Sequence, residues 1–326
     1  MGIKNLSKVI LKFAPNSIKY KKIENYKNRI IGIDTNLMAY KMIYAIRKNG
    51  YDLKNKEIVV THIHGIIQKL VAFKIYNITP IFVFDGIPPS IKEKTLRERK
   101  VFKDFMEQKY LTAVTQDEKK KYYFMKSDIT AQELDEISEL IDIFGYNIID
   151  SKEEADSQLA SLSKDGIIDS VATDDLDILI FGGRLVLKNF TVSPEKKIQE
   201  INLQKLLKEL SLTQEQLIDI GILLGCDYCP TVKGIGPVNS YKLIKKYGSI
   251  DNLVEEGIIK LNLNYKKVKA YFLNPKIEKY STEIIRNDPL DYQRLDEFLK
   301  KYGYDEKYVK NIRDLIIHNV KDLPGL

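Results

Sequence analysis

Residues 151–181 read SKEEADSQLASLSKDGIIDSVATDDLDILIF. In this stretch, apolar side chains recur at helical spacing from Ala155 to Leu162, and Gly166 would end the helix. The run at 167–172 is short and apolar, as is typical of a buried strand. One group of acidic residues therefore lies at the start of a helix, and a second group lies just beyond the end of a strand.

The carboxylates of this stretch are Glu153, Glu154, Asp156, Asp174, Asp175 and Asp177. Taken alone, Glu154 could cap the helix, because Ser151 three positions earlier completes an S-x-x-E capping box. Capping does not explain Asp175 and Asp177, whose like charges would raise each other's pKa unless a cation joined them. The pattern therefore favours a divalent metal site.

Two earlier apolar strands also end on an aspartate. NRIIGIDTN at 28–36 places Asp34 after its apolar run, and TPIFVFDG at 79–86 places Asp85 in the same way. The helices predicted after the first strand cover 37–46 and 58–76. Strands that alternate with helices predict a parallel sheet covered on both faces, with ligands at the carboxyl ends of the strands. Aspartates are also common in turns and caps. Three strands that share the feature nevertheless favour convergence of Asp34, Asp85 and Asp175.

Later elements are predicted from the same patterns: strands at 147–150 and 184–190, and helices at 203–210 and 214–224, the last introduced by Thr213.

Composition narrows the class of protein. The chain has 326 residues, of which 44% are hydrophobic, so it can bury a sizeable core in about two domains or one large one. Its formal net charge of +7 favours a polyanionic partner such as nucleic acid. No apolar run approaches the ~18 residues of a membrane span, and the N-terminus has no signal-peptide pattern. We therefore expect a soluble intracellular protein with no membrane partner, in the nucleus or the cytoplasm.

Cysteine and histidine are scarce. Cys226 and Cys229 form a single CxxC, which could be a redox pair but lacks two further ligands for zinc. His62 and His64 lie two residues apart in a helical pattern and so face different ways, which favours structural or solvated roles over a metal site. Chemistry based on a histidine general base therefore has few candidates.

Residues 88–127 differ in composition from the rest of the chain. After Pro88 and Pro89 the segment is highly charged and free of glycine, and it has helical character, which indicates an insertion or lid. Lys92, Arg99 and Lys103 are spaced to share one helix face. That face could bind phosphates, although a charged helix face is often only solvated.

Residues 225–237, GCDYCPTVKGIGP, precede a helix predicted at 238–247 that Gly248 would end. The glycines of GIGP allow a phosphate to approach the backbone, and the helix start offers N–H groups and a positive dipole end. Lysines on the helix could add counter-charge; they are Lys242, Lys245 and Lys246.

Six motifs, in this order along the chain, resemble the structure-specific 5′ nucleases of the XPG type, and most closely the flap endonucleases. They are MGIKNL at 1–6, IGIDTN at 31–36, IFVFDGIPPSIK at 81–92, SKEEADSQLA at 151–160, ATDDLDILIFG at 172–182 and LLGCDYCPTVKGIGP at 223–237. Segments YFLNPKI at 271–277 and DYQRLDEFL at 291–299 are similar to C-terminal parts of the same family.

The resemblance implies an α/β fold with a PIN-like nuclease core, in which a parallel sheet lies between helices. It implies a nuclease core over 1–256 and a C-terminal helical DNA-binding region over 257–326 packed on it. The parts of the core would be an N-terminal region at 1–87, a helical arch at 88–127, an internal nuclease region at 128–216 and a helix-two-turn-helix at 217–248.

The resemblance also implies a two-metal active site. Its metal ligands would be seven carboxylates: Asp34, Asp85, Glu154, Asp156, Asp175, Asp177 and Asp227. Hard oxygen ligands select two Mg²⁺ ions, for which Mn²⁺ can substitute. Lys92 and Arg99 match arch residues that contact the scissile phosphate, and Tyr40 matches an aromatic residue that stacks on a nearby base.

Further positions correspond to DNA contacts of the family. They are Gly2, Arg47, Gly234, Ile235, Gly236, Lys242 and Lys245. Gly2 matches an N-terminal residue that packs close to the active site. A monovalent cation at the helix-two-turn-helix is a further expectation, and the expected partner is branched or flapped DNA bound by a monomer. Residues 293–299, QRLDEFL, superficially suggest a sliding-clamp-binding box, but the segment lacks paired aromatics and reads better as the start of a helix.

Asp156 departs from the family pattern, because flap endonucleases usually carry Glu there and the related 5′ exonuclease branch carries Asp. The predicted function is a Mg²⁺-dependent 5′ flap endonuclease with 5′ to 3′ exonuclease activity, acting in DNA replication or repair. The alternatives are a predominantly 5′ to 3′ double-strand exonuclease, a catalytically silent DNA-junction binder and a haloacid-dehalogenase-like phosphatase. The last would need a carboxylate two residues after Asp34, where this chain has Asn36.

Overall fold

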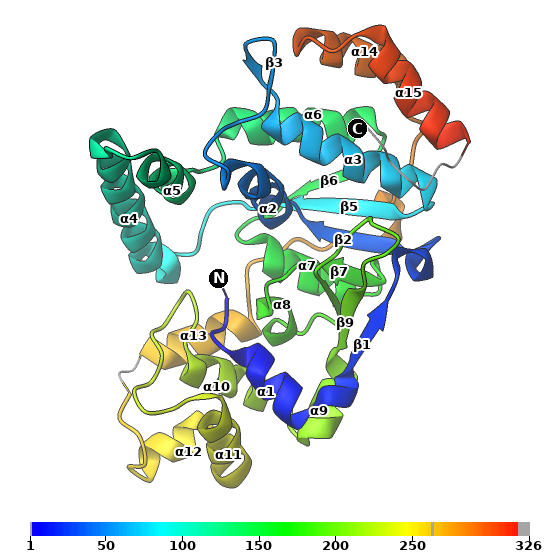
Figure 1. Ribbon diagram of the computed structural model, residues 1–326. Helices are drawn as coiled ribbons and strands as arrows, with labels where there is room; N and C mark the ends of the chain where they lie inside the picture. Colours follow the sequence, from blue (N-terminus) through cyan, green and yellow to red (C-terminus); the bar gives the residue numbers. More distant parts are fainter. Residues whose placement is uncertain (1, 262–263, 319–326) are drawn as a thin grey trace.

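The protein is built on a seven-stranded, mainly parallel sheet (Figure 1). The computed structural model describes residues 2–261 and 264–318. In spatial order the strands are β1 (Ile18–Lys21), β9 (Ile198–Asn202), β8 (Leu185–Lys188), β7 (Ser170–Ala172), β2 (Ile30–Asp34), β5 (Thr79–Phe84) and β6 (Asn147–Asp150). The strands from β8 to β6 run parallel, whereas β9 pairs antiparallel with both β8 and β1. The predicted fold class is confirmed, with an antiparallel edge added to it.

Helices cover both faces of the sheet, and each face has its own hydrophobic core. Side chains alternate along β5, so Ile81 and Val83 enter one core while Phe82 and Phe84 enter the other. The helices of the core that contains Phe82 are α2 (Thr35–Arg47), α3 (Thr61–Ile75), α6 (Ala131–Ile143), α14 (Tyr292–Lys301) and α15 (Glu306–Ile317). Those of the other core are α1 (Leu6–Phe13), α7 (Ala155–Lys164), α8 (Asp177–Ile180), α9 (Leu203–Leu210), α10 (Gln214–Leu224), α11 (Pro237–Tyr247), α12 (Ile250–Glu255) and α13 (Asn264–Leu273).

Two helices project away from the sheet (Figure 1, left). They are α4 (Glu93–Thr112) and α5 (Gln116–Lys126), and both fall within the segment predicted as an arch. Thr115 and Glu118 form a capping box that starts α5. Four short 3₁₀ helices and one hairpin complete the described elements: η1 (Pro15–Ser17), η2 (Ile23–Tyr26), η3 (Ser90–Lys92), η4 (Thr282–Ile284), and β3 (Lys54–Asn55) with β4 (Ile58–Val59).

Several predicted boundaries agree with the structure to the residue, among them those of β6, α9 and α10. Thr213 caps α10, and Gly248 ends α11 with a φ of 85°. The predicted 58–76 helix begins only at Thr61, because Ile58 and Val59 pair with β3 instead. Residues 293–299 lie in α14, as expected for the start of a helix.

The capping box that the sequence offered as an alternative reading of Ser151 and Glu154 does not form. The Ser151 hydroxyl donates to the carbonyl oxygen of Phe84 at 2.6 Å, so it ties β6 to β5 and does not cap α7. Helix α7 starts at Ala155, so Glu154 is its N-cap residue. The Glu154 side chain makes no capping hydrogen bond to the helix. This leaves the Glu154 carboxylate available to other partners.

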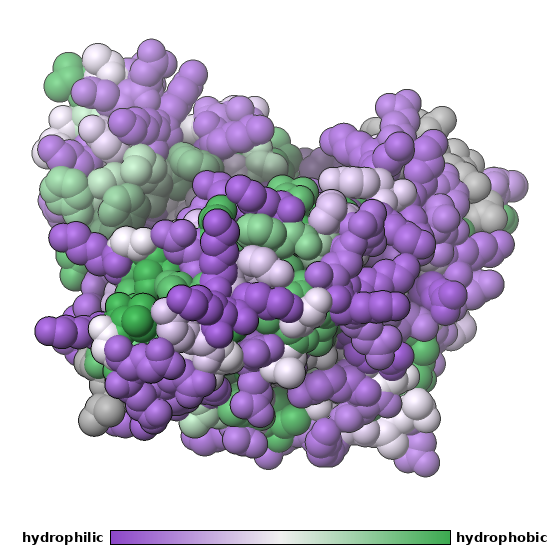
Figure 2. Space-filling model, turned by 90° about the horizontal axis from the view of Figure 1, so that it is seen from below, coloured by the Kyte–Doolittle hydropathy of each residue, from purple (hydrophilic) through white to green (hydrophobic). Residues whose placement is uncertain are grey.

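Seen from below, the surface is mostly hydrophilic, with small apolar patches between polar side chains (Figure 2). Within the described residues, no helix has both the length and the apolar character that crossing a membrane requires.

Candidate metal centre

One cavity at the carboxyl ends of the parallel strands collects the predicted catalytic residues. It has a volume of about 230 Å³ and opens between the sheet, α2 and the base of α4. Its lining includes all seven predicted metal ligands together with Tyr40, Lys92 and Arg99. Residues from distant parts of the chain therefore converge as the strand pattern suggested.

Hydrogen bonds from neighbouring backbone and hydroxyl groups orient the first carboxylates. Asp34 ends β2; one oxygen accepts the N–H of Leu37 at 3.0 Å, and the other accepts the hydroxyl of Thr173 at 3.0 Å. Asp85 follows β5 and accepts the N–H of Ala155 at 2.8 Å. The Asp85 side chain thus accepts the first N–H of α7, the capping role that the sequence suggested for Ser151.

The N-terminus packs directly against the next pair of carboxylates. Asp175 accepts the N–H of Asp177 at 3.0 Å, and Asp177 accepts the N–H of Ile3 at 2.7 Å. A Cβ added to Gly2, whose φ is +71°, would lie 1.8 Å from an oxygen of Asp175. Only glycine fits this conformation and this space, which places Gly2 beside the site.

Burial and mutual repulsion disfavour the charged forms of several carboxylates in this cavity. Burial and the neighbouring Asp85 raise the pKa of Asp34 to about 7. Burial and the charge of Asp175 likewise raise the pKa values of Asp156 and Asp177 well above their usual range. One oxygen of Asp156 is buried without a hydrogen-bond partner. Such crowded, underused oxygens suit hard divalent cations.

Residues 2–261 and 264–318 contain no group of three or more Asp, Glu, Cys or His side chains already arranged as a metal-ligand set. Within the same residues, the positive charge in the cavity comes from two side chains, one at the end of η3 and one on α4. Lys92 contacts the carboxylate of Glu154 and lies 3.4 Å from an oxygen of Asp227, while Arg99 donates to that oxygen at 2.6 Å. Burial alone would lower the pKa of Lys92, but these carboxylates raise it above its ordinary value.

Lys103, expected on the same face of α4, contacts Asp128 near the end of α5. Tyr40 stacks on Tyr44 at a centroid distance of 3.8 Å, and the Tyr44 hydroxyl donates to the carbonyl of Ser127. Tyr40 therefore lines the cavity, and its stacking partner Tyr44 contacts the chain just after α5.

Sequence reasoning missed Tyr228 as a residue of the site. Its buried hydroxyl donates to the carboxylate of Glu154, across 74 positions of sequence. Burial raises the pKa of Glu154, and the lowering by Lys92 and Tyr228 does not fully offset it. The signal that could have found Tyr228 is its place directly after Asp227.

We expect Tyr228→Phe to weaken Mg²⁺ binding about 10- to 100-fold, because a group that orients a metal ligand typically contributes that much. The measurement is the Mg²⁺ dependence of the predicted DNA cleavage, fitted for the midpoint. Tyr271→Phe is a matched control, since the Tyr271 ring packs edge-on against that of Tyr228 with their centroids 5.0 Å apart, and the buried Tyr271 hydroxyl donates to none of the predicted ligands. Equal midpoints for Tyr228→Phe and the unmodified protein would contradict the role.

Metal-free protein should lose stability as pH rises between about 4 and about 7. The pKa of Asp34 is raised from 3.8 to about 7 in the folded state. Across that window the folded protein keeps a proton that the unfolded chain releases, so the free energy of unfolding falls with rising pH. Melting temperatures in chelator should show this fall, and saturating Mg²⁺ should reduce it. A melting temperature that climbs across the window in chelator would contradict the burial of this charge.

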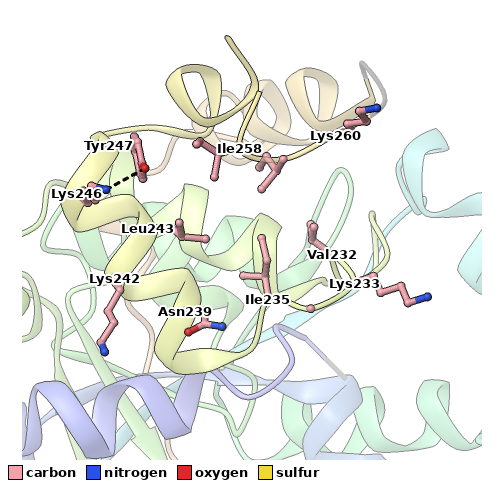
Figure 3. A pocket seen from close by; sticks show the side chains of 12 residues that line it. Val232, Lys233, Ile235, Asn239, Lys242, Leu243, Lys246, Tyr247, Ile258 and Lys260 are labelled. Carbon is pink, nitrogen blue, oxygen red and sulfur yellow. Dashed lines mark hydrogen bonds between the residues drawn. The ribbon is translucent and has the colours of Figure 1, made fainter. Parts of the chain in front are cut away.

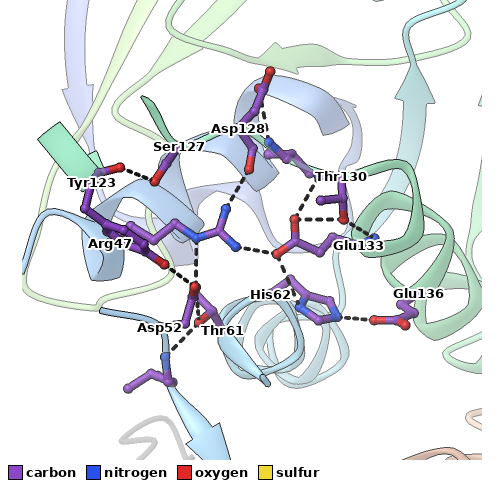
Figure 4. A network of polar contacts seen from close by, with 12 residues as sticks. Arg47, Asp52, Thr61, His62, Tyr123, Ser127, Asp128, Thr130, Glu133 and Glu136 are labelled. Atoms are coloured by element: carbon purple, nitrogen blue, oxygen red, sulfur yellow. Dashed lines mark hydrogen bonds and ion pairs between the residues drawn. The ribbon is translucent and has the colours of Figure 1, made fainter. Parts of the chain in front are cut away.

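Arg47 lies apart from the cavity in a buried polar network (Figure 4). Its guanidinium donates to Asp52 at 2.7 Å, to the backbone oxygen of Asp128 at 2.6 Å and to Glu133 at 2.6 Å. Tyr123 of α5 also contacts Asp52. The network joins α2 and α6 to the chain at the end of α5. For Arg47 to make its predicted DNA contact, these hydrogen bonds would have to break. His62 is buried beside it and contacts Glu136, in keeping with a structural role.

Replacing Arg47 by methionine is expected to lower the free energy of unfolding by about 3–5 kcal/mol, because it leaves Glu133 buried without its cation. Arg29→Met serves as the control: that side chain is 58% exposed and pairs with Asp169 at 3.2 Å, so its loss should cost less than about 1 kcal/mol. Denaturant unfolding measures both. A cost for Arg47→Met no larger than for Arg29→Met would show that the network contributes little.

The predicted DNA contacts near α11 surround an open groove of about 560 Å³ (Figure 3). Gly234, Ile235 and Lys242 line it, and Gly236 directly precedes α11. Added Cβ atoms at Gly234 and Gly236 would meet nothing within 4 Å, so this backbone is open to a ligand. Lys245 is placed differently: its ammonium donates to the carbonyls of Leu210 and Ser211 at the end of α9.

Two family models match the chain: the XPG N-terminal domain over residues 1–104 and the XPG I-region over residues 145–227. A protein of Entamoeba dispar called Flap endonuclease 1 is 33% identical over 98% of this chain and 88% of its own length. The solved flap endonuclease-1 of Methanococcus jannaschii is 27% identical, with a TM-score of 0.71 over 93% of this chain and 96% of that one. The catalytic core of Rad2 in complex with a DNA substrate shares the fold, with a TM-score of 0.76 and 22% identity over 97% of this chain and all of that one.

Proposed function

Because this chain belongs to the XPG family and is a structure-specific flap endonuclease of that family, we propose that it hydrolyses DNA phosphodiesters near the junction of single and double strands, using divalent cations. We further propose that it releases nucleotides from a 5′ end as an exonuclease at the same site. The observation that carries the proposal is one cavity that joins seven carboxylates to Lys92 and Arg99.

The seven carboxylates are the proposed holders of two Mg²⁺ ions, with Mn²⁺ as a substitute. Their donors are all oxygens, and their mutual repulsion and burial require added positive charge. Two divalent cations held by these carboxylates would stabilise charge on the attacking and leaving oxygens and would make water more acidic.

Lys92 and Arg99 are the proposed contacts of the scissile phosphate. Without DNA, the Lys92 and Arg99 side chains pair with the carboxylates of Glu154 and Asp227. With divalent metal ions at the carboxylates, these two basic side chains would instead pair with the oxygens of an entering phosphate. They would then stabilise the negative charge that grows during hydrolysis. Tyr40, beside them, is the proposed stacking partner of an unpaired terminal base.

The groove at α11 is the proposed grip on the DNA backbone away from the cut. Gly234 and Gly236 expose backbone, the start of α11 supplies N–H groups, and Lys242 adds charge. A monovalent cation bound to this loop is part of the proposal. Lys245 contributes indirectly, by holding α9 against α11.

Cleavage of a 5′-labelled flap oligonucleotide tests the function. We expect Mg²⁺-dependent products that end at the junction, together with fewer mononucleotides from the exonuclease activity. Mononucleotides as the main product would assign the chain to the exonuclease alternative. Tight flap binding without cutting in Mg²⁺ or Mn²⁺ would overturn the proposal in favour of a silent junction binder, and hydrolysis of small phosphate esters alone would favour a phosphatase.

A further inference from the structure

Cys226 and Cys229 close a tight turn that the proposed chemistry does not use. The N–H of Cys226 donates to the carbonyl of Cys229 at 2.9 Å, and the N–H of Cys229 donates back at 3.3 Å. Residues paired in this way have Cα atoms about 5.5 Å apart, inside the range of about 4.4–6.8 Å that a disulfide spans. Both thiols are free, and their sulfur atoms lie 3.5 Å apart.

The two residues between the cysteines both contact the metal centre. Asp227 is a predicted ligand that accepts from Arg99 at 2.6 Å, and its carbonyl accepts the hydroxyl of Thr95 on α4 at 2.6 Å. Tyr228 donates to Glu154. Any change in the shape of this turn therefore acts on two predicted ligands and on the base of the arch.

The flanking chain leaves little room to absorb such a change elsewhere. The N–H of Val232 donates to the carbonyl of Leu223 at 3.1 Å, which clamps the turn just outside the cysteines. A Cβ at Gly225, whose φ is +86°, would lie 2.5 Å from the backbone nitrogen of Thr231. Closing the bond draws the two sulfur atoms from 3.5 Å to about 2.05 Å. Because the flanking chain is held on both sides, the backbone adjustment that accompanies this closure falls on the tip of the turn, which is Asp227 and Tyr228.

We propose that Cys226 and Cys229 form a reversible disulfide that lowers the nuclease activity; this rests on the proposed function, because it acts through Asp227. The oxidant is a hydroperoxide. The half-buried Cys229 meets it first: its sulfur attacks one peroxide oxygen, giving a sulfenic acid and releasing water. The sulfur of Cys226 then attacks that of Cys229, and the hydroxyl leaves with the Cys226 proton as a second water. Two thiols thus lose two electrons and reduce one hydrogen peroxide to two waters.

A dithiol reductant reverses the reaction by thiol–disulfide exchange. In a reducing compartment the pair would remain reduced until the oxidant rises, which is the usual behaviour of intracellular regulatory disulfides.

The chain contains only two cysteines, so the number of free thiols reports this site alone. The full chain is treated with hydrogen peroxide, after which free thiols, intact mass and flap cleavage in Mg²⁺ are measured. We expect both thiols to disappear, the mass to fall by two hydrogen atoms and the cleavage rate to drop at least tenfold, since a displacement of about 1 Å in a catalytic group can cost about 10²-fold. Dithiothreitol should restore all three.

Cys226→Ser and Cys226→Ala are the control variants, because neither can close the bond. Both should cut like the untreated protein and keep that activity after peroxide. Thiols that survive peroxide, a disulfide that leaves the cleavage rate unchanged, or equal loss of activity in the control variants would each overturn the proposal. Lack of cleavage by the reduced, untreated protein would instead overturn the nuclease assignment, and thiol count and mass would still report whether the disulfide forms.

Discussion

Replacing Asp175 by alanine is expected to lower the rate of flap cleavage at saturating Mg²⁺ by about 10³-fold or more. Asp175 lies at the centre of the acidic cavity: it raises the pKa values of Asp156 and Asp177 by its charge, and Gly2 leaves just enough room for it. A cation held partly by Asp175 would contribute several kcal/mol to the transition state, and each ~1.4 kcal/mol corresponds to tenfold in rate.

Asp174→Ala is the matched control, one residue away. Asp174 accepts the N–H of Asn189 at 2.6 Å and contacts Lys41, and it does not line the acidic cavity. Its loss should change the cleavage rate less than about tenfold while costing some stability. Flap affinity without divalent cations should survive in both variants, because neither removes a positive charge from the DNA-binding surface. Turnover by Asp175→Ala equal to that of the unmodified protein would remove the assigned metal site.

The convergence of Asp34, Asp85 and Asp175 could be predicted from the sequence for a physical reason. Parallel strands share one carboxyl edge, so residues that end three such strands must meet there. The same reasoning cannot find partners that depend on packing between distant segments. Tyr228 reaches Glu154, and Arg47 reaches Glu133, across 74 and 86 positions, and neither pairing leaves a local pattern.

The edge strand β1 escaped prediction for a related reason, whereas β6 at the opposite edge was predicted correctly. Residues 18–21, IKYK, form β1, whose side chains are mostly solvent-facing, so they show no apolar run. The strand exists because β9, about 180 residues later, offers it a pairing partner. The misplaced capping box at Ser151 follows the same rule, since the pairing of β6 with β5 brings Asp85 to the start of α7 and diverts the serine hydroxyl to Phe84.

Lys92→Ala should lower turnover about 10²- to 10³-fold with little change in KM, which is the usual cost of removing one preorganised charge from the transition state. Lys94→Ala is the control, since the Lys94 side chain is 82% exposed and only 3.9 Å from Glu98 within the same helix. A second readout separates this role from a structural one. Lys92 competes with cations for Glu154, so its removal should leave the Mg²⁺ midpoint unchanged or lower, whereas general damage to the site would raise it. An effect confined to KM, or a raised Mg²⁺ midpoint with unchanged turnover, would mean that Lys92 holds the arch in place and does not act on the phosphate.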